Sequence, residues 1–300
     1  MKRILAAFLA AAMLASMAVV GFAADPPTWE TIPATTPTYD STWGRFFANG
    51  TPITIQQNPD GAGVLVTWDN DTMTVPSTTI FFGGGDGSED GSAEGKKFAS
   101  SSITMISGTV YGIYGGGVLN TAVGTANVLV YDGTVVYEGI CGGGGASGKD
   151  GSVGTADDPA NSPCRVDVAN VTVEGGSAVL LYGGGQGYSS VGTANLTVKG
   201  GTWSYVTGGG SNGYTGTANL KVENGDISTL QSVNPGEVGS ASVEMTGGTV
   251  DEFFLGGDAD EGEGATGKIG TVEAEITGGS VTTLAAGRND SKDMSLEEYK

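Results

Sequence analysis

The sequence contains no histidine, and basic residues are scarce: 13 Lys and Arg stand against 33 Asp and Glu, for a formal net charge of −20. Without histidine, catalytic units that use an imidazole base, such as Ser-His-Asp or Cys-His, are excluded. The excess of negative charge argues against nucleic acid and anionic lipid surfaces as partners, because both are polyanions. Structural proteins, glycan-binding proteins and carboxylate-based enzymes are the classes left to consider.

Long apolar runs are also lacking, except at the N-terminus. Lys2 and Arg3 precede an apolar run (residues 4–20) that ends in small residues at Gly21 and Ala23. A basic start, an apolar segment and small residues before the cut define a secretory signal peptide. We expect cleavage after Ala23, a secreted or cell-surface location in a bacterial envelope, and no membrane insertion after cleavage. The alternative is an uncleaved anchor, for which the run is long enough.

Glycine is abundant instead, with 54 residues gathered mainly in short clusters. Ten-residue blocks that end in glycine recur along the chain, among them GTANVLVYDG, DVANVTVEGG, GTANLTVKGG and GTANLKVENG. The repeat unit is about 24 residues with two insertions, which excludes propeller blades and leucine-rich repeats. The closing glycines, spaced by 25, 43, 25, 24, 23 and 31 residues, are Gly108, Gly133, Gly176, Gly201, Gly225, Gly248 and Gly279.

Within each block apolar and polar residues alternate, as at Val128 and Val130, which is the pattern of a half-buried strand. A second short strand follows the closing glycine, as at Thr134 and Val135. Two strands, a glycine corner and a short third side account for the repeat, and parallel crossovers are right-handed in almost all proteins. We therefore predict an all-β fold, a right-handed parallel β-helix in the form of a three-sided solenoid with about 24 residues per coil.

These patterns divide the chain into four segments. We assign residues 1–23 to the signal peptide, 24–74 to an N-terminal lead and small β cap, 75–287 to the solenoid and 288–300 to a C-terminal tail. The cap is expected from three short strand-like pieces, PITIQ, GVLVTW and TMTV, which would cover the open edge of the first coil. The tail is too short to cover a coil, so the solenoid ends are candidate surfaces for self-association.

Four asparagines occupy one place in the repeat, each directly after an alanine. Stacked amides at such positions can form a hydrogen-bonded ladder. Two interpretations stay open: a polar binding stripe, or a structural ladder at a corner that satisfies turn backbone groups. The second is favoured because asparagine is a common turn residue. The ladder residues are Asn127, Asn170, Asn195 and Asn219.

Cys141 and Cys164 are the only two cysteines, and they bracket the insertion that lengthens one repeat to 43 residues. In an exported protein a disulfide is the expected use of such a pair. We therefore predict a bridge that closes a surface loop and contributes about 3 kcal/mol to stability.

Two acidic inserts offer clusters of carboxylates. Such clusters suit a hard cation, so calcium is the one candidate cofactor. The alternative, a solvated acidic loop, is favoured on composition. The candidate ligands are Asp86, Glu89, Asp90, Asp258, Asp260 and Glu261.

Several tyrosines lie near the glycine clusters, and exposed aromatic rings on a rigid face are suited to stacking on sugars. The alternative, favoured here, is that each ring packs over bare glycine backbone. The tyrosines are Tyr111, Tyr114, Tyr137, Tyr182, Tyr188, Tyr205 and Tyr214.

The segments GTANVLVYDGTV, GTANLTVKGGTW and VEMTGGTV resemble bacterial secreted or surface adhesin-like right-handed β-helix repeat proteins, over residues 75–286. The resemblance implies architecture strongly, function weakly, and no catalytic residues. We expect a secreted or cell-surface solenoid that acts as an adhesin or envelope scaffold without catalysis, with a glycan or host-surface ligand. The alternatives are a carbohydrate-active β-helix enzyme, of polysaccharide lyase or glycosidase type, and a calcium-stabilised carbohydrate-binding module.

Overall fold

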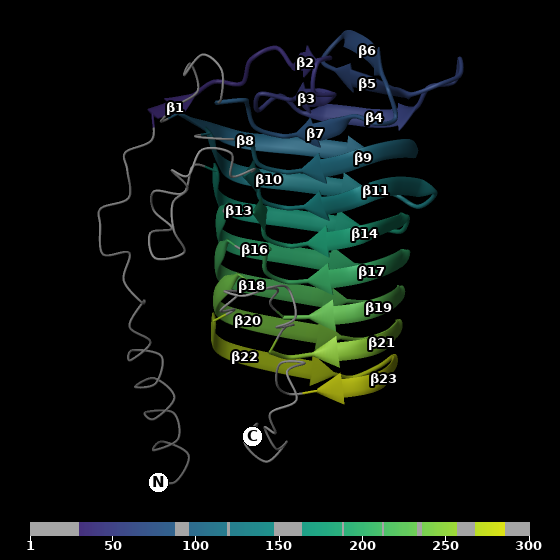
Figure 1. The fold of residues 1–300 in the computed structure, drawn as a ribbon, viewed down its shortest axis with the longest axis vertical. Coiled ribbons are helices and arrows are strands. Elements are labelled where there is room, and N and C mark those ends of the chain that lie inside the picture. Colours follow the sequence, from purple (N-terminus) through teal and green to yellow (C-terminus); the bar gives the residue numbers. More distant parts are fainter. Residues whose placement is uncertain are drawn as a thin grey trace, which may run out of the picture.

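The computed structural model describes residues 30–87, 96–118, 121–146, 164–187, 189–211, 213–232, 236–256 and 268–285. Within these residues the protein is all-β and contains no helix. Most strands lie in two sheets, and in both sheets the strands follow one another along the same axis (Figure 1). The all-β class and the parallel arrangement of the strands are confirmed. Among the same residues there is no helix of the length and apolarity that a membrane span requires.

The first sheet holds the longer strands. It is parallel from β22 to β4 and continues as an antiparallel meander through β5 and β6, while β1 pairs with β8. Its order is β22 (Lys268–Ile276), β20 (Glu237–Met245), β18 (Tyr214–Val222), β16 (Ser190–Val198), β13 (Cys164–Val173), β10 (Thr121–Val130), β8 (Lys96–Met105), β4 (Ile53–Gln57), β5 (Val64–Trp68) and β6 (Asp71–Val75), with β1 at Glu30–Ile32.

The second sheet is parallel except for its first pair, β2 and β3. A separate two-stranded parallel sheet joins β12 (Gly145–Ala146) to β15 (Gln186–Gly187). The order of the second sheet is β2 (Thr38–Asp40), β3 (Arg45–Phe47), β7 (Ile80–Phe82), β9 (Gly108–Tyr114), β11 (Thr134–Cys141), β14 (Ser177–Tyr182), β17 (Thr202–Thr207), β19 (Asp226–Gln231), β21 (Thr249–Phe254) and β23 (Ser280–Ala285).

The register of the strands follows the sequence repeat. Val128 pairs with Val171, Val171 with Leu196, and Leu196 with Leu220, as the aligned blocks predict. All seven closing glycines have a positive φ, between 77° and 122°, a region that L-residues with a side chain rarely adopt. The glycines therefore end the strands of the first sheet and turn the chain toward the second. The predicted N-terminal β cap contributes β1 to β6, which extend both sheets.

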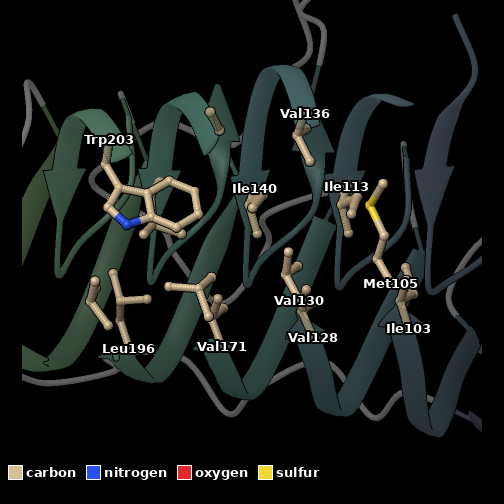
Figure 2. Packing of buried hydrophobic residues seen from close by; sticks show 14 of the residues in the cluster. Ile103, Met105, Ile113, Val128, Val130, Val136, Ile140, Val171, Leu196 and Trp203 are labelled. Atoms are coloured by element: carbon tan, nitrogen blue, oxygen red, sulfur yellow. The ribbon is translucent and has the colours of Figure 1, made fainter. Parts of the chain in front are cut away.

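The core lies between the two sheets. Alternate residues of each strand point inward and stack on their equivalents in neighbouring repeats, as Ile103, Val128 and Val171 do opposite Ile140 and Trp203 (Figure 2). These side chains are at most 2% exposed. Each such burial of an aliphatic or aromatic side chain contributes about 1.5–3 kcal/mol, so the stacked rows are the main source of stability.

The corners at the end of the second-sheet strands are glycine clusters whose backbones hydrogen-bond to each other. Gly84 N donates to Gly116 O at 3.0 Å, and Gly116 N donates to Gly143 O at 3.0 Å. A Cβ atom on Gly84 would lie 2.8 Å from Gly117 Cα, closer than any side chain tolerates. The close approach of neighbouring repeats therefore requires glycine at this corner.

Candidate ligand pocket on the second sheet

The outer face of the second sheet contains a pocket of about 380 Å³ near the N-terminal end of the stack. One wall consists of outward side chains of β3, β7, β9 and β11, and the other consists of β12, β15 and the glycine-rich segments beside them. The side chains that define its chemistry are Arg45, Ile80, Phe82, Tyr114, Glu138 and Gln186.

One outward column of the sheet loses its side chains next to the pocket. Gly112 lies between Ile80 and Gly139, and Gly139 pairs in turn with Leu180. A Cβ atom on Gly112 would lie 3.5 Å from Glu138 Oε2 and 3.2 Å from the ring of Tyr114. A side chain at Gly112 would therefore lie against Tyr114 and Glu138, two of the residues that line the pocket.

A β-bulge in β11 places Glu138 beside Gly112. The register of β11 shifts between Val136 and Gly139 against both neighbouring strands, which leaves one residue more in β11 than opposite it. Tyr137 and Glu138 both reach the outer face as a result, and Tyr137 is 58% exposed. β-Bulges often redirect side chains beside functional sites. This one places the carboxylate of Glu138 next to Gly112, which has no side chain.

Stacked aromatic rings form the buried side of the pocket. Phe47 stacks on Phe82 with ring centroids 5.4 Å apart, and Phe82 stacks on Tyr114 at 5.0 Å. A Cβ atom on Gly145 would lie 3.2 Å from the Phe82 ring and 3.4 Å from the Tyr114 ring, so the rings pack against bare backbone.

The tyrosines predicted beside the glycine clusters divide into two groups. Tyr114 and Tyr182 are buried, in agreement with the packing interpretation, whereas Tyr111, Tyr137 and Tyr205 are exposed. Tyr214 is half-buried in the first sheet, and Tyr188 lies outside the described residues. Exposed rings suited to stacking on a ligand therefore occur on the second sheet, on β9, β11 and β17.

The polar groups of the pocket converge on the hydroxyl of Tyr114. This hydroxyl lies 3.4 Å from Glu138 Oε2 and also within hydrogen-bond distance of Gln186 Oε1. Burial raises the pKa of Tyr114 well above its ordinary value, and Cys141 and Glu138 raise it further, so the hydroxyl is a neutral donor. The opposite end of the pocket carries Arg45, whose guanidinium lies 5.7 Å from the ring of Trp43 and forms no ion pair within the described part of the chain.

Arg45, Glu138 and Gln186 were not among the residues selected from the sequence. One signal for Glu138 was present in the spacing of glycines: Gly142 follows Gly133 by 9 positions, whereas Gly115 follows Gly108 by 7 and Gly183 follows Gly176 by 7. Arg45 lies in the segment predicted as the cap, and Gln186 follows an ordinary glycine cluster. No pattern in the sequence joins these three positions.

The predicted disulfide is not formed in the structure. No bridge joins Cys141 and Cys164, and both are buried. Ile140 points into the core between the sheets, so the next residue, Cys141, points outward into the cluster with Phe82 and Tyr114. Cys164 begins β13 in the other sheet, beside Gly144. Burial raises the pKa of the Cys141 thiol, which keeps it protonated and unreactive.

Of the predicted calcium ligands, the structure describes Asp86, whose backbone forms an isolated parallel bridge with Val118. Among the described residues there is no group of three or more side chains suited to a metal ion. Calcium binding therefore stays a prediction. The candidates outside the described residues are Glu89, Asp90, Asp258, Asp260 and Glu261.

The four asparagines form a continuous hydrogen-bonded ladder. Asn170 Nδ2 donates to Asn127 Oδ1 at 3.0 Å, Asn195 Nδ2 to Asn170 Oδ1 at 2.8 Å, and Asn219 Nδ2 to Asn195 Oδ1 at 2.8 Å. The expected position at a corner is wrong, because each asparagine lies inside a strand of the first sheet. The amides therefore bond mainly to each other, and only Asn127 Nδ2 reaches a backbone oxygen, that of Ser101.

The pocket and the ladder differ in what they can do. The amides of the ladder are largely occupied by each other, whereas Arg45 presents N–H donors to the cavity and Glu138 has a second carboxylate oxygen besides the one near Tyr114. A ligand with several hydroxyl or amide groups would match this arrangement. The chain matches no protein-family model, no curated protein and no solved structure.

Proposed function

We propose that the mature protein is a secreted or cell-surface solenoid that acts as an adhesin or envelope scaffold without catalysis. The observation that carries the proposal is the alternation of successive strands between two parallel sheets, in the same register from repeat to repeat. Parallel strands connected in this way cross over in one hand, and right-handed crossovers are the rule. The finer architecture in the proposal is a right-handed solenoid of three sides.

The glycine-rich segments supply the third side in this proposal. β12 pairs in parallel with β15, and Gln186 N donates to Gly144 O at 3.0 Å. Gly145 N donates to Gly117 O at 3.2 Å, which extends the same ladder by one repeat. A third row of parallel hydrogen bonds beside the two sheets supports a wall around the core rather than two separate layers.

Export follows from the signal peptide at residues 1–23, and a surface role suits a rigid stack with outward faces of different chemistry. Exposed aromatic side chains on the same sheet as a polar pocket support a glycan or host-surface ligand. The pocket holds one carboxylate, Glu138, whereas most glycosidases use two, so its composition favours binding over hydrolysis.

Export is tested by expression of the full chain in a bacterial host, N-terminal sequencing of the product and protease treatment of intact cells. We expect a mature protein that begins at Ala24 and is secreted or digested at the surface. A product that stays in the cytoplasm with Met1 in place would refute the proposal.

Adhesion is tested with a glycan array in calcium and in EDTA, followed by an assay for new reducing ends in any bound polysaccharide. We expect binding without breakdown. Breakdown would establish the carbohydrate-active alternative instead, and binding lost in EDTA would establish the calcium-stabilised module.

A further inference from the structure

We infer that the pocket on the second sheet binds one ring of a neutral glycan, held by Arg45, Glu138 and Gln186. The inference rests on the proposed function and names the class of ligand and the residues that select it. Its basis is the combination of apolar walls, planar polar side chains and balanced charge in one cavity. Each of these features corresponds to a property of a neutral sugar ring.

The apolar lining suits the C–H face of a sugar. Ile80, Val118 and the edge of Phe82 line the cavity, whose volume of about 380 Å³ is at the small end of the range for ligand sites. Sugar rings carry apolar C–H patches that pack on aromatic and aliphatic side chains. A single ring, with its neighbours outside, is therefore the unit that the cavity accommodates.

The polar lining suits pairs of neighbouring hydroxyls. Arg45 presents a fork of N–H donors, Glu138 presents two acceptor oxygens, and Gln186 presents both kinds of atom. Adjacent hydroxyls on a sugar ring can donate to a carboxylate while they accept from a guanidinium. The Tyr114 hydroxyl donates to Gln186 Oε1 and lies 3.4 Å from Glu138 Oε2, so both side chains have a polar neighbour in the pocket before the ligand binds.

Charge selects a neutral ligand over an acidic one. The pocket contains one cation, Arg45, and one anion, Glu138, so its side chains sum to no net charge. The whole chain carries a formal charge of −20, which repels polyanions such as uronate polymers. A free amino acid could also match one cation and one anion. An extended chain is favoured because Trp43, whose ring lies 5.7 Å from the Arg45 guanidinium, and Tyr137, next to Glu138 in the sequence, are 57% and 58% exposed and can stack on adjacent rings.

The test is affinity gel electrophoresis and isothermal titration of the mature protein with five polysaccharides. The neutral probes are galactomannan, xyloglucan and β-glucan; the acidic probes are polygalacturonate and alginate. Glycine and glutamate test amino-acid binding. We expect measurable affinity for at least one neutral polymer, and affinity for the acidic polymers at least ~10-fold weaker.

Two variants test the site itself. Gly112→Leu adds a side chain against Ile80, Tyr114 and Glu138, which line the pocket, and should abolish binding, whereas Thr283→Leu adds the same side chain to an exposed position of the same column. Glu138→Gln should weaken binding about 10-fold, since a hydrogen bond to a charged group is lost, whereas Glu252→Gln on the same face should leave it unchanged. Thermal melts monitored by circular dichroism establish that each variant is folded, and Glu138→Gln decides the question if Gly112→Leu does not fold.

The two proposals fail in different ways. Neutral-glycan binding that survives both Gly112→Leu and Glu138→Gln would overturn the assignment of the pocket and leave adhesion standing. Preference for the acidic polymers or for glutamate would overturn the ligand class. Absence of all glycan binding, in a protein shown to be displayed, would overturn the inference and reduce the proposed function to a passive scaffold.

Discussion

The outer faces of the two sheets share the same strand stacking but differ in how strictly they repeat. On the first sheet, Asn127 and its equivalents recur at one position over four consecutive repeats and bond to each other. On the second sheet, the column that begins at Arg45 changes at nearly every step, through Ile80, Gly112, Gly139, Leu180 and Tyr205. The regular column on the first sheet forms a hydrogen-bonded ladder, whereas the irregular column on the second sheet lies beside a pocket.

The difference teaches that the repeat specifies the backbone, while departures from the repeat specify the site. Every repeat keeps the same inward alternation because stacking of the core depends on it. Outward positions are under no such constraint, so Gly112 can lack a side chain and β11 can carry an extra residue without loss of the core. Functional chemistry is therefore expected where the outward column is least repetitive.

The largest expected effect lies in the core that both sheets share. Trp203 is 1% exposed, pairs with the small Ala178 of the preceding repeat, and donates its indole N–H to Gly200 O at 2.9 Å. Trp203→Ala should lower the free energy of unfolding by about 3–5 kcal/mol, because it leaves a cavity between the sheets. Chemical denaturation measures the change. Val179→Ala, at an outward position, should cost less than ~0.5 kcal/mol; similar costs for both would mean that the core does not carry the stability.

The dependence of the free energy of unfolding on alkaline pH tests the burial of Tyr114 in the pocket. Burial raises the pKa of Tyr114 in the folded state, so above pH ~10 the unfolded chain loses a proton that the folded protein keeps. The contribution of this group is fully present below that pH, and the free energy of unfolding then falls by about 1.4 kcal/mol per pH unit as pH rises. Denaturation at several pH values measures the slope. Tyr114→Phe should flatten it, and a slope unchanged in this variant would show that Tyr114 is not buried as described.

Most of the architecture could be predicted from the sequence because it depends on local and periodic features. Closing glycines such as Gly133 need a positive φ, and alternation in the blocks sets which residues face inward. The pocket could not be predicted, because it depends on which side chains meet across repeats. Arg45 and Gln186 are 141 residues apart in the numbering, and only the stacking of β3, β11 and β15 brings them near Glu138. The asparagines were expected at a corner but lie inside strands. Glycines occur both in these strands and at the corners, so the sequence does not show where a strand ends and a corner begins.

The regular face is tested by removal of a central and a terminal amide from its ladder. Asn195 donates to Asn170 and accepts from Asn219, whereas Asn219 contributes only the bond that it donates. Asn195→Ala should therefore destabilise by about 1–3 kcal/mol and Asn219→Ala by about half as much, since each net hydrogen bond contributes about 0.5–1.5 kcal/mol. Equilibrium denaturation of both variants gives the comparison. Equal losses would mean that the amides act independently and form no ladder in solution.

The smallest expected effect concerns a link between the two sheets. A disulfide from Cys141 to Cys164 would tie an outward position of the second sheet to the start of a strand in the first. Since no bridge joins them and Ile140 and Cys141 face opposite sides of their strand, we expect dithiothreitol to leave the free energy of unfolding unchanged. Thiol titration should find two reactive groups in denaturant and none in the native protein, because both cysteines are buried. If reduction lowered the free energy of unfolding by about 3 kcal/mol, the disulfide would exist in solution. Cys141 and Cys164 would then have to lie on the same side of their strands.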